Sequence, residues 1–107
     1  MELNAHTLTL APAMVKNGYV AFPMSAKNMF PSDSLGSWSP EGMGATVELR
    51  FGPHRRMSDV CIKSTKSLAF RARMSGWLQG ELRARAGDRL RVERLAERIY
   101  QIVPLSS

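Results

Sequence analysis

At 107 residues, with 44% hydrophobic and 22% charged residues, the chain has the size and composition of one soluble globular domain spanning 1–107. No apolar run approaches the roughly 18 residues that a membrane-spanning helix needs, and the N-terminus lacks the basic and apolar regions of a signal peptide. The single cysteine, Cys61, excludes an internal disulfide. Together these features favour a cytoplasmic location.

The positive charge lies in the second half of the chain, within a net charge of +6. Residues 1–48 carry two lysines and four acidic residues, whereas residues 49–107 carry thirteen basic and five acidic residues. Eleven of the 15 basic residues are arginine, whose planar guanidinium suits phosphate groups and guanine edges. Charge alone does not distinguish a surface that binds nucleic acid from a basic surface that is only solvated.

The first third of the chain is predicted to contain two short strands, a turn and a short helix. Polar and apolar residues alternate in the first strand, and Asn-Gly marks the turn because both residues accept a positive φ. Ser25 is a suitable N-cap for the helix. The expected elements are a strand at 7–10, an interruption at 11–15, a turn at 16–18, a strand at 19–22 and a helix at 25–30.

A long loop is predicted from Pro31 to Gly44, because glycine, proline and serine dominate this stretch. Leu35 and Trp38 are expected to pin the loop to the body of the protein, since burying a tryptophan offsets loop entropy through its large area. The alternative is that Trp38 forms a base-stacking platform on an exposed tip.

The middle of the chain is predicted to form three strands joined by two turns. A strand at 45–51 points Val47, Leu49 and Phe51 inward, and a hairpin loop follows at 52–56. The return strand at 57–62 is expected to bury Val60 and Ile62 and to turn Cys61 the other way. A polar tip at 63–67 then leads into a strand at 68–72, with Arg71 and Arg73 opposite its apolar face.

The last third is predicted to contain a helix and a hairpin. The helix runs from Gly76 to about Ala84, and Trp77 is expected in the core because two glycines leave the helix dependent on packing. A turn at 86–88 precedes a hairpin of strands 90–95 and 99–103. The complete pattern predicts a mainly β, α+β fold of about seven strands and two short helices, closed or half-closed into a barrel.

Groups that could support catalysis are sparse. The two histidines, His6 and His54, lie far apart in the sequence, and one cysteine with two histidines does not make a typical zinc site. The acidic residues are dispersed, and no glycine-rich loop leads into a Lys-Ser or Lys-Thr pair. We therefore expect no enzyme activity, no metal and no cofactor.

Four segments resemble one known family, the DNA-binding pseudobarrel, which includes plant B-three transcription-factor domains and the effector domains of EcoRII-type restriction endonucleases. They are V-K-N-G-Y-V-A-F-P at 15–23, M-F-P at 29–31, G-W-L-Q-G-E-L at 76–82 and R-A-R-A-G-D-R-L-R-V at 83–92. The resemblance covers most of the chain and implies a seven-stranded open pseudobarrel. It also implies sequence-specific binding to double-stranded DNA, as a stand-alone module beside a possible separate nuclease or regulatory partner.

In that family two loop arms grip the major groove, and the resemblance carries them to Ala11–Tyr19 and Lys63–Ser67. Asn17 would pair with adenine, Lys66 or Arg71 would pair with guanine, and the tip hydroxyls would bind phosphates or base edges. The implied DNA-binding residues are Lys16, Asn17, Tyr19, Lys63, Ser64, Thr65, Lys66, Ser67, Arg71 and Arg73, with Lys27, Arg55 and Arg56 as phosphate anchors.

Two other interpretations stay open. The end of the chain, from Ala86 to Leu105, also resembles the closing strands of AbrB-like swapped-hairpin transcription regulators, which need a dimer to close. A protein-interaction or RNA-binding accessory module is the second alternative. The solution mass separates the first alternative from a monomeric barrel, and binding to duplex DNA against RNA separates the second.

Overall fold

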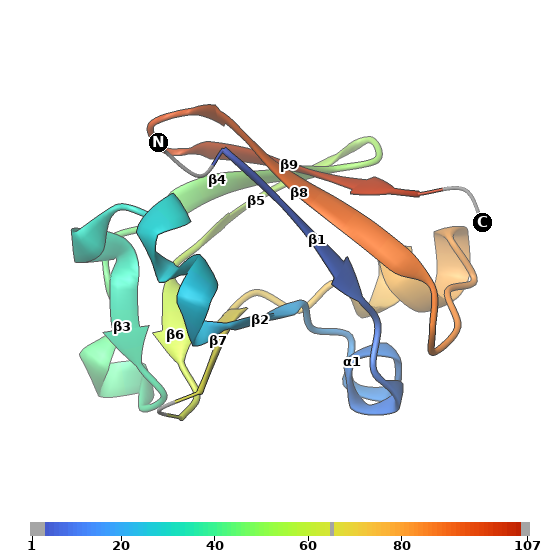
Figure 1. The fold of residues 1–107 in the computed structure, drawn as a ribbon, viewed down its shortest axis with the longest axis horizontal. Coiled ribbons are helices and arrows are strands. Elements are labelled where there is room, and N and C mark those ends of the chain that lie inside the picture. The colour runs from blue at the N-terminus through green and yellow to red at the C-terminus, as the bar shows by residue number, and fades with distance from the viewer. Residues whose placement is uncertain (1–3, 65, 106–107) are drawn as a thin grey trace.

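The computed structural model describes residues 4–64 and 66–105, which form two β-sheets with short helical segments between them (Figure 1). One sheet has five strands in the order β1-β8-β9-β4-β5, and the other has four in the order β2-β7-β6-β3. The strands are β1 (Ala5–Thr9), β2 (Ala21–Pro23), β3 (Leu35–Ser37), β4 (Val47–Phe51), β5 (His54–Ser58), β6 (Val60–Ile62), β7 (Ser67–Phe70), β8 (Arg89–Ala96) and β9 (Ile99–Pro104).

The helical segments are short, and only one of those in the described ranges is an α-helix. The helical elements are α1 (Pro12–Asn17), the 3-10 helices η1 (Met24–Met29), η2 (Ser32–Ser34) and η3 (Pro40–Gly42), and the π-helix η4 (Gly76–Glu81). No helix in this part of the chain is long and apolar enough to cross a membrane. The predicted mainly β, α+β class is confirmed by the two sheets and their short helical connections.

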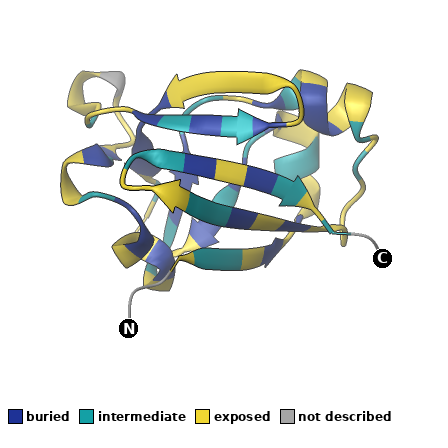
Figure 2. Ribbon diagram, turned by 90° about the horizontal axis from the view of Figure 1, so that it is seen from above, coloured by how far each residue is buried: buried dark blue, intermediate teal, exposed yellow. Residues whose placement is uncertain are grey.

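The two sheets form layers around one core. In Figure 1 the five-stranded sheet lies above, and the four-stranded sheet lies below with α1 beside it. Buried residues alternate with more exposed ones along β4 and the first half of β8 (Figure 2), as expected for a sheet with one face on the core. Parallel pairing of β4 with β9 and of β3 with β6 joins segments far apart in the sequence.

Aromatic side chains fill the centre of the core. Phe22, Phe30 and Phe70 pack edge to face, with ring centroids 5.1 to 5.6 Å apart. Tyr100 is fully buried beside Phe30, and its hydroxyl donates a hydrogen bond of 2.7 Å to the carbonyl of Met29. This hydrogen bond connects β9 of the upper sheet to η1 below.

The strands predicted with the clearest alternation are found in the structure. The strand predicted at 45–51 is β4, whose Val47, Leu49 and Phe51 are buried as expected. The predicted C-terminal hairpin is β8 and β9, paired antiparallel. Trp77 is buried, as expected for a helix that depends on packing.

Other local predictions are wrong in informative ways. The interruption and turn predicted at 11–18 contain α1, which begins with a proline and ends at Gly18 in the left-handed region, with φ +71°. The predicted loop at 31–44 contains β3, and the hairpin loop predicted at 52–56 shrinks because β5 already begins at His54. The helix predicted at 25–30 is the 3-10 helix η1.

The orientation predicted for the return strand is also wrong. Val60 is buried as expected, but Cys61 is 2% exposed, whereas Ile62 is 39% exposed. The predicted strand breaks at Asp59 into β5 and β6, which belong to different sheets, and within β6 both Val60 and Cys61 are buried. Cys61 consequently lies beneath side chains that come from other segments.

Candidate nucleic-acid interface

The predicted second arm is the turn between β6 and β7, and it projects into solvent. The amides of Lys63 and Ser64 donate to the carbonyl of Ser67 at 3.0 and 3.3 Å, and the hydroxyls of Ser64 and Ser67 lie 3.2 Å apart. Ser64 and Lys66 are exposed, whereas Lys63 and Ser67 are half-buried. Thr65 lies outside the described residues. The turn is thus braced by its own hydrogen bonds, and its polar side chains remain accessible to a partner.

The predicted first arm is built around α1. Its end is fixed because Gly18 caps the helix and packs so closely on Ser75 that a Cβ atom at Gly18 would lie 2.0 Å from the Ser75 hydroxyl oxygen. The side-chain amide of Gln79 donates to the carbonyls of Val15 and Lys16 at 2.7 and 3.0 Å. Lys16 and Asn17 remain exposed at the end of the helix.

The two arms meet at the ring of Tyr19. The ammonium of Lys63 lies 4.0 Å from the centroid of that ring, and the guanidinium of Arg73 lies 5.6 Å from it. Lys63 is also 5.5 Å from the ring of Trp38, which comes from the segment after β3. Arg73 in turn donates a 3.0 Å hydrogen bond to the carbonyl of Asn17. Four segments distant in the sequence therefore converge on one cationic and aromatic cluster.

Trp38 is exposed rather than packed as a loop anchor. Its relative exposure is 57%, so the prediction that it pins the loop is wrong, whereas Leu35 does pack against the core. The loop is held instead by Arg71, which donates to the carbonyls of Ser37 and Trp38. The indole is thereby left accessible at the edge of the cluster.

Arg71 connects the buried Asp59 to the loop that carries Trp38. Asp59 is fully buried and accepts hydrogen bonds from Arg71 Nε at 2.6 Å and Nη2 at 3.0 Å, and from the amide of Gly44 at 2.9 Å. The hydrogen bond to Asp59 raises the pKa of Arg71 further above its ordinary value. Because its guanidinium binds both the carboxylate and the loop carbonyls, Arg71 positions the loop rather than projecting toward a partner.

A hollow of about 270 Å³ opens between the two aromatic rings. Its lining consists of Tyr19 and Trp38 at the sides, Arg71 and Arg73 at the rim, and Cys61, Ala69 and Phe70 at the floor. The thiol of Cys61 donates to the carbonyl of Ala69 at 3.4 Å, and burial raises the pKa of this thiol. The hollow therefore combines apolar and aromatic walls with a positively charged rim.

The predicted phosphate anchors divide into two groups. Arg55 and Arg56 are exposed on β5 and line a neighbouring hollow of about 240 Å³ together with Arg73, and Arg56 Nη1 lies 3.5 Å from the carbonyl of Arg73. Arg73 thus connects them to the cluster at Tyr19. Lys27 is exposed on η1, and within the described part of the chain no polar contact links it to this cluster.

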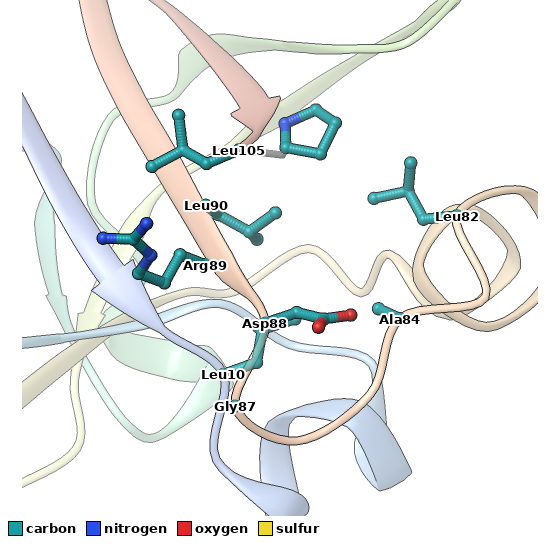
Figure 3. A pocket seen from close by; sticks show the side chains of 9 residues that line it. Leu10, Leu82, Ala84, Gly87, Asp88, Arg89, Leu90 and Leu105 are labelled. Carbon is teal, nitrogen blue, oxygen red and sulfur yellow. The ribbon is translucent and has the colours of Figure 1, made fainter. Parts of the chain in front are cut away.

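Another hollow, of about 390 Å³, lies at the start of β8 (Figure 3). Leu10, Leu82, Leu90 and Leu105 line part of it, polar and apolar surface contribute about equally, and in Figure 3 the guanidinium of Arg89 points away from it. The residues that line it are all different from those predicted to bind DNA.

Sequence reasoning missed Asp59 and assigned Trp38 the wrong surroundings. Both residues reach this region only through contacts between distant segments. For Trp38 the sequence held one signal, since a Gly/Pro/Ser-rich loop can present a tryptophan as a stacking platform.

Among the described residues, no three side chains of His, Cys, Asp or Glu gather closely enough to hold a metal ion. Comparisons with family models, curated proteins and solved structures gave no match for this chain.

Proposed function

We propose that this chain binds double-stranded DNA sequence-specifically through its two arms. The observation that carries the proposal is the meeting of the half-buried Tyr19 and Lys63 with the exposed Arg73 in one surface cluster. Cations beside exposed aromatic rings suit nucleic acid, because phosphates need positive charge and bases offer flat faces for stacking. Cleavage or regulation would belong to a separate nuclease or regulatory partner.

The proposed roles follow from the surroundings of each side chain. Lys63, Lys66, Arg55 and Arg56 would contact phosphates, since they are cations around one part of the surface and phosphate contacts position a protein on DNA. The hydroxyls of Ser64 and Ser67 would add uncharged hydrogen bonds to the DNA phosphates.

Base recognition would fall to the first arm. Lys16 and Asn17 are exposed at the end of α1, and an asparagine amide can pair with the edge of adenine in the major groove. Arg71 would support the interface by holding the Trp38 backbone. Lys27 lies on η1, outside the cluster, and would contact at most the flanking backbone.

The proposal includes the finer fold assignment, an open pseudobarrel of the B-three and EcoRII-effector kind. It is supported by the parallel pairing of β4 with β9 and by the position of the C-terminal hairpin, because β8 also pairs with β1 of the same chain. A hairpin flanked on both sides by its own chain favours a monomer over an AbrB-like swapped dimer. Measuring the mass in solution tests this, and an obligate dimer would favour the AbrB-like alternative.

The decisive experiment is the salt dependence of duplex binding. Lys63→Ala combined with Lys66→Ala should weaken binding and lower the magnitude of the log-log salt slope by about one unit for each phosphate that the variant no longer neutralises. The matched control is Arg89→Ala with Arg91→Ala, which removes the same charge from exposed positions of β8 and should leave the slope unchanged. Equal slopes for both double variants would place the contact surface elsewhere, and absent duplex binding at low salt would overturn the proposal.

A second candidate is an RNA-binding or protein-interaction accessory role. The observation favouring RNA is the exposed Trp38 next to Lys63, because single strands bind aromatic platforms beside cations. Competition between duplex DNA and single-stranded RNA in the same assay decides between them. Selection of bound duplexes from a random pool then tests sequence specificity.

A further inference from the structure

We infer that the hollow between Tyr19 and Trp38 holds a single DNA base that has left the duplex stack. This inference rests on the proposed function and adds to it a site for one base. It starts from the placement of the hollow, which lies where the two proposed arms meet and has Arg71 and Arg73 at its rim. A backbone held at that rim would place its bases opposite the opening.

The size of the hollow limits what it can accept. Sites for drug-sized ligands measure about 300–1,000 Å³, whereas this hollow measures about 270 Å³. It therefore suits one heterocycle better than a complete nucleotide or a peptide segment. A base attached to a sugar outside the mouth meets this limit, because only the flat ring system has to enter.

The chemistry of the walls also fits a base. Extruded bases are bound by stacking on aromatic rings and on arginine guanidinium planes, over apolar side chains. Tyr19 and Trp38 supply rings, Arg73 supplies a guanidinium, and Cys61 and Phe70 supply an apolar floor. The Lys63 ammonium already lies 4.0 Å from the Tyr19 ring and 5.5 Å from the Trp38 ring, so a cationic ligand would have to displace a like charge there.

Lys63 lies against a face of the Tyr19 ring on which the base would stack. Its ammonium is 4.0 Å from the ring centroid, so this face is covered by the lysine in the free protein. Stacking of a base on an aromatic ring is stronger than a cation–π contact at an exposed site. Binding would therefore move Lys63 from the ring to a phosphate, and the base would replace it.

Trp38 is held in place through its backbone carbonyl, which leaves its ring free for stacking. Arg71 binds the carbonyls of Ser37 and Trp38 and is itself held by the buried Asp59. The backbone under the indole is thus braced, whereas 57% of the residue remains exposed. Such an arrangement offers a stacking surface at a fixed position.

The test compares duplexes that differ only in how easily one base leaves the stack. The protein is titrated with a fully paired duplex and with duplexes carrying one mismatch or one 2-aminopurine, whose fluorescence rises when it unstacks. Mismatched bases cost less to extrude, so we expect roughly tenfold tighter binding to the mismatched duplex and a rise in 2-aminopurine emission on binding.

Variants of the two rings connect that preference to the hollow. Tyr19→Ala and Trp38→Ala should each reduce the ratio of mismatched to paired affinity toward one, and Tyr19→Phe should retain it because the ring remains. Arg89→Ala with Arg91→Ala serves as the control and should bind as the unaltered protein does. Circular dichroism confirms that each variant is folded.

The outcomes separate this inference from the proposed function. Duplex binding with the expected salt slope, but with equal affinities and unchanged emission, would overturn the base site and leave the function intact. A mismatch preference that survives in both ring-to-alanine variants would also overturn it. Absent binding to every duplex would overturn the function and the site together.

Discussion

Replacing Asp59 with alanine should destabilise the protein strongly. Asp59 is fully buried and accepts three hydrogen bonds, two from Arg71 and one from the amide of Gly44. Removing one partner of a buried ion pair costs about 3–5 kcal/mol. Because the Arg71 side chain is 21% exposed and keeps its bonds to two carbonyls, we expect the lower end, about 3 kcal/mol.

Urea unfolding measures this destabilisation as a lower midpoint with a similar slope. A domain of this size has a free energy of unfolding of about 5–15 kcal/mol, so the variant should still fold and the difference can be measured directly. The control is Glu48→Ala, which removes the partly exposed pair of Glu48 and Arg50 and should cost at most about 1 kcal/mol.

The result that refutes this reasoning is a destabilisation by Asp59→Ala no larger than that by Glu48→Ala. It would mean that water or other groups replace the carboxylate without cost. Arg71→Ala provides an independent check, because it leaves a buried carboxylate unpaired and should cost at least as much as Asp59→Ala. Fluorescence of Trp38 should change in Arg71→Ala, because that variant removes the donor to the Trp38 carbonyl.

Three further measurements check other parts of the structure. Gly18→Ala should cost more than about 1 kcal/mol in a thermal or urea melt, because alanine is strained at φ +71° and its Cβ would collide with Ser75. Tyr100→Phe should cost about 1–3 kcal/mol in urea unfolding, because it leaves the Met29 carbonyl without its buried donor. Burial raises the pKa of the Cys61 thiol, so the folded state is favoured fully below the pKa of an unfolded thiol and less as the pH rises above it. The free energy of unfolding, measured from about pH 8 to 10, should therefore fall with pH, and Cys61→Ala should reduce this fall.

The sequence predicts the upper sheet better than the lower one, and the reason is physical. β4 alternates buried apolar residues with half-buried polar ones because one of its faces packs on the core, so its pattern can be recognised directly. The hairpin of β8 and β9 is a local pairing across a short turn. By contrast, β3 has three residues, and its place depends on parallel pairing with β6. The residues Leu35–Ser37 contain no local pattern that predicts pairing with β6.

For the candidate site too, local features can be predicted from the sequence, whereas contacts between distant segments cannot. The polar tip and the turn before Tyr19 can be recognised from the chain, because their residue types mark exposed turns. That they meet depends on the contacts of Tyr19 with Lys63 and Arg73, which join segments far apart in the sequence. The sequence therefore predicts the exposed tip, but not the helix α1 or the hollow beside Tyr19.

The surroundings of Trp38 show why tertiary structure changes the interpretation of a single residue. A tryptophan in a glycine- and proline-rich loop is expected to be buried, because its large area can hold the loop against the core. Here the buried Asp59 and Arg71 hold the same loop through the backbone carbonyls of Ser37 and Trp38. Since the loop no longer needs the indole as an anchor, the ring is left exposed, 5.5 Å from the ammonium of Lys63.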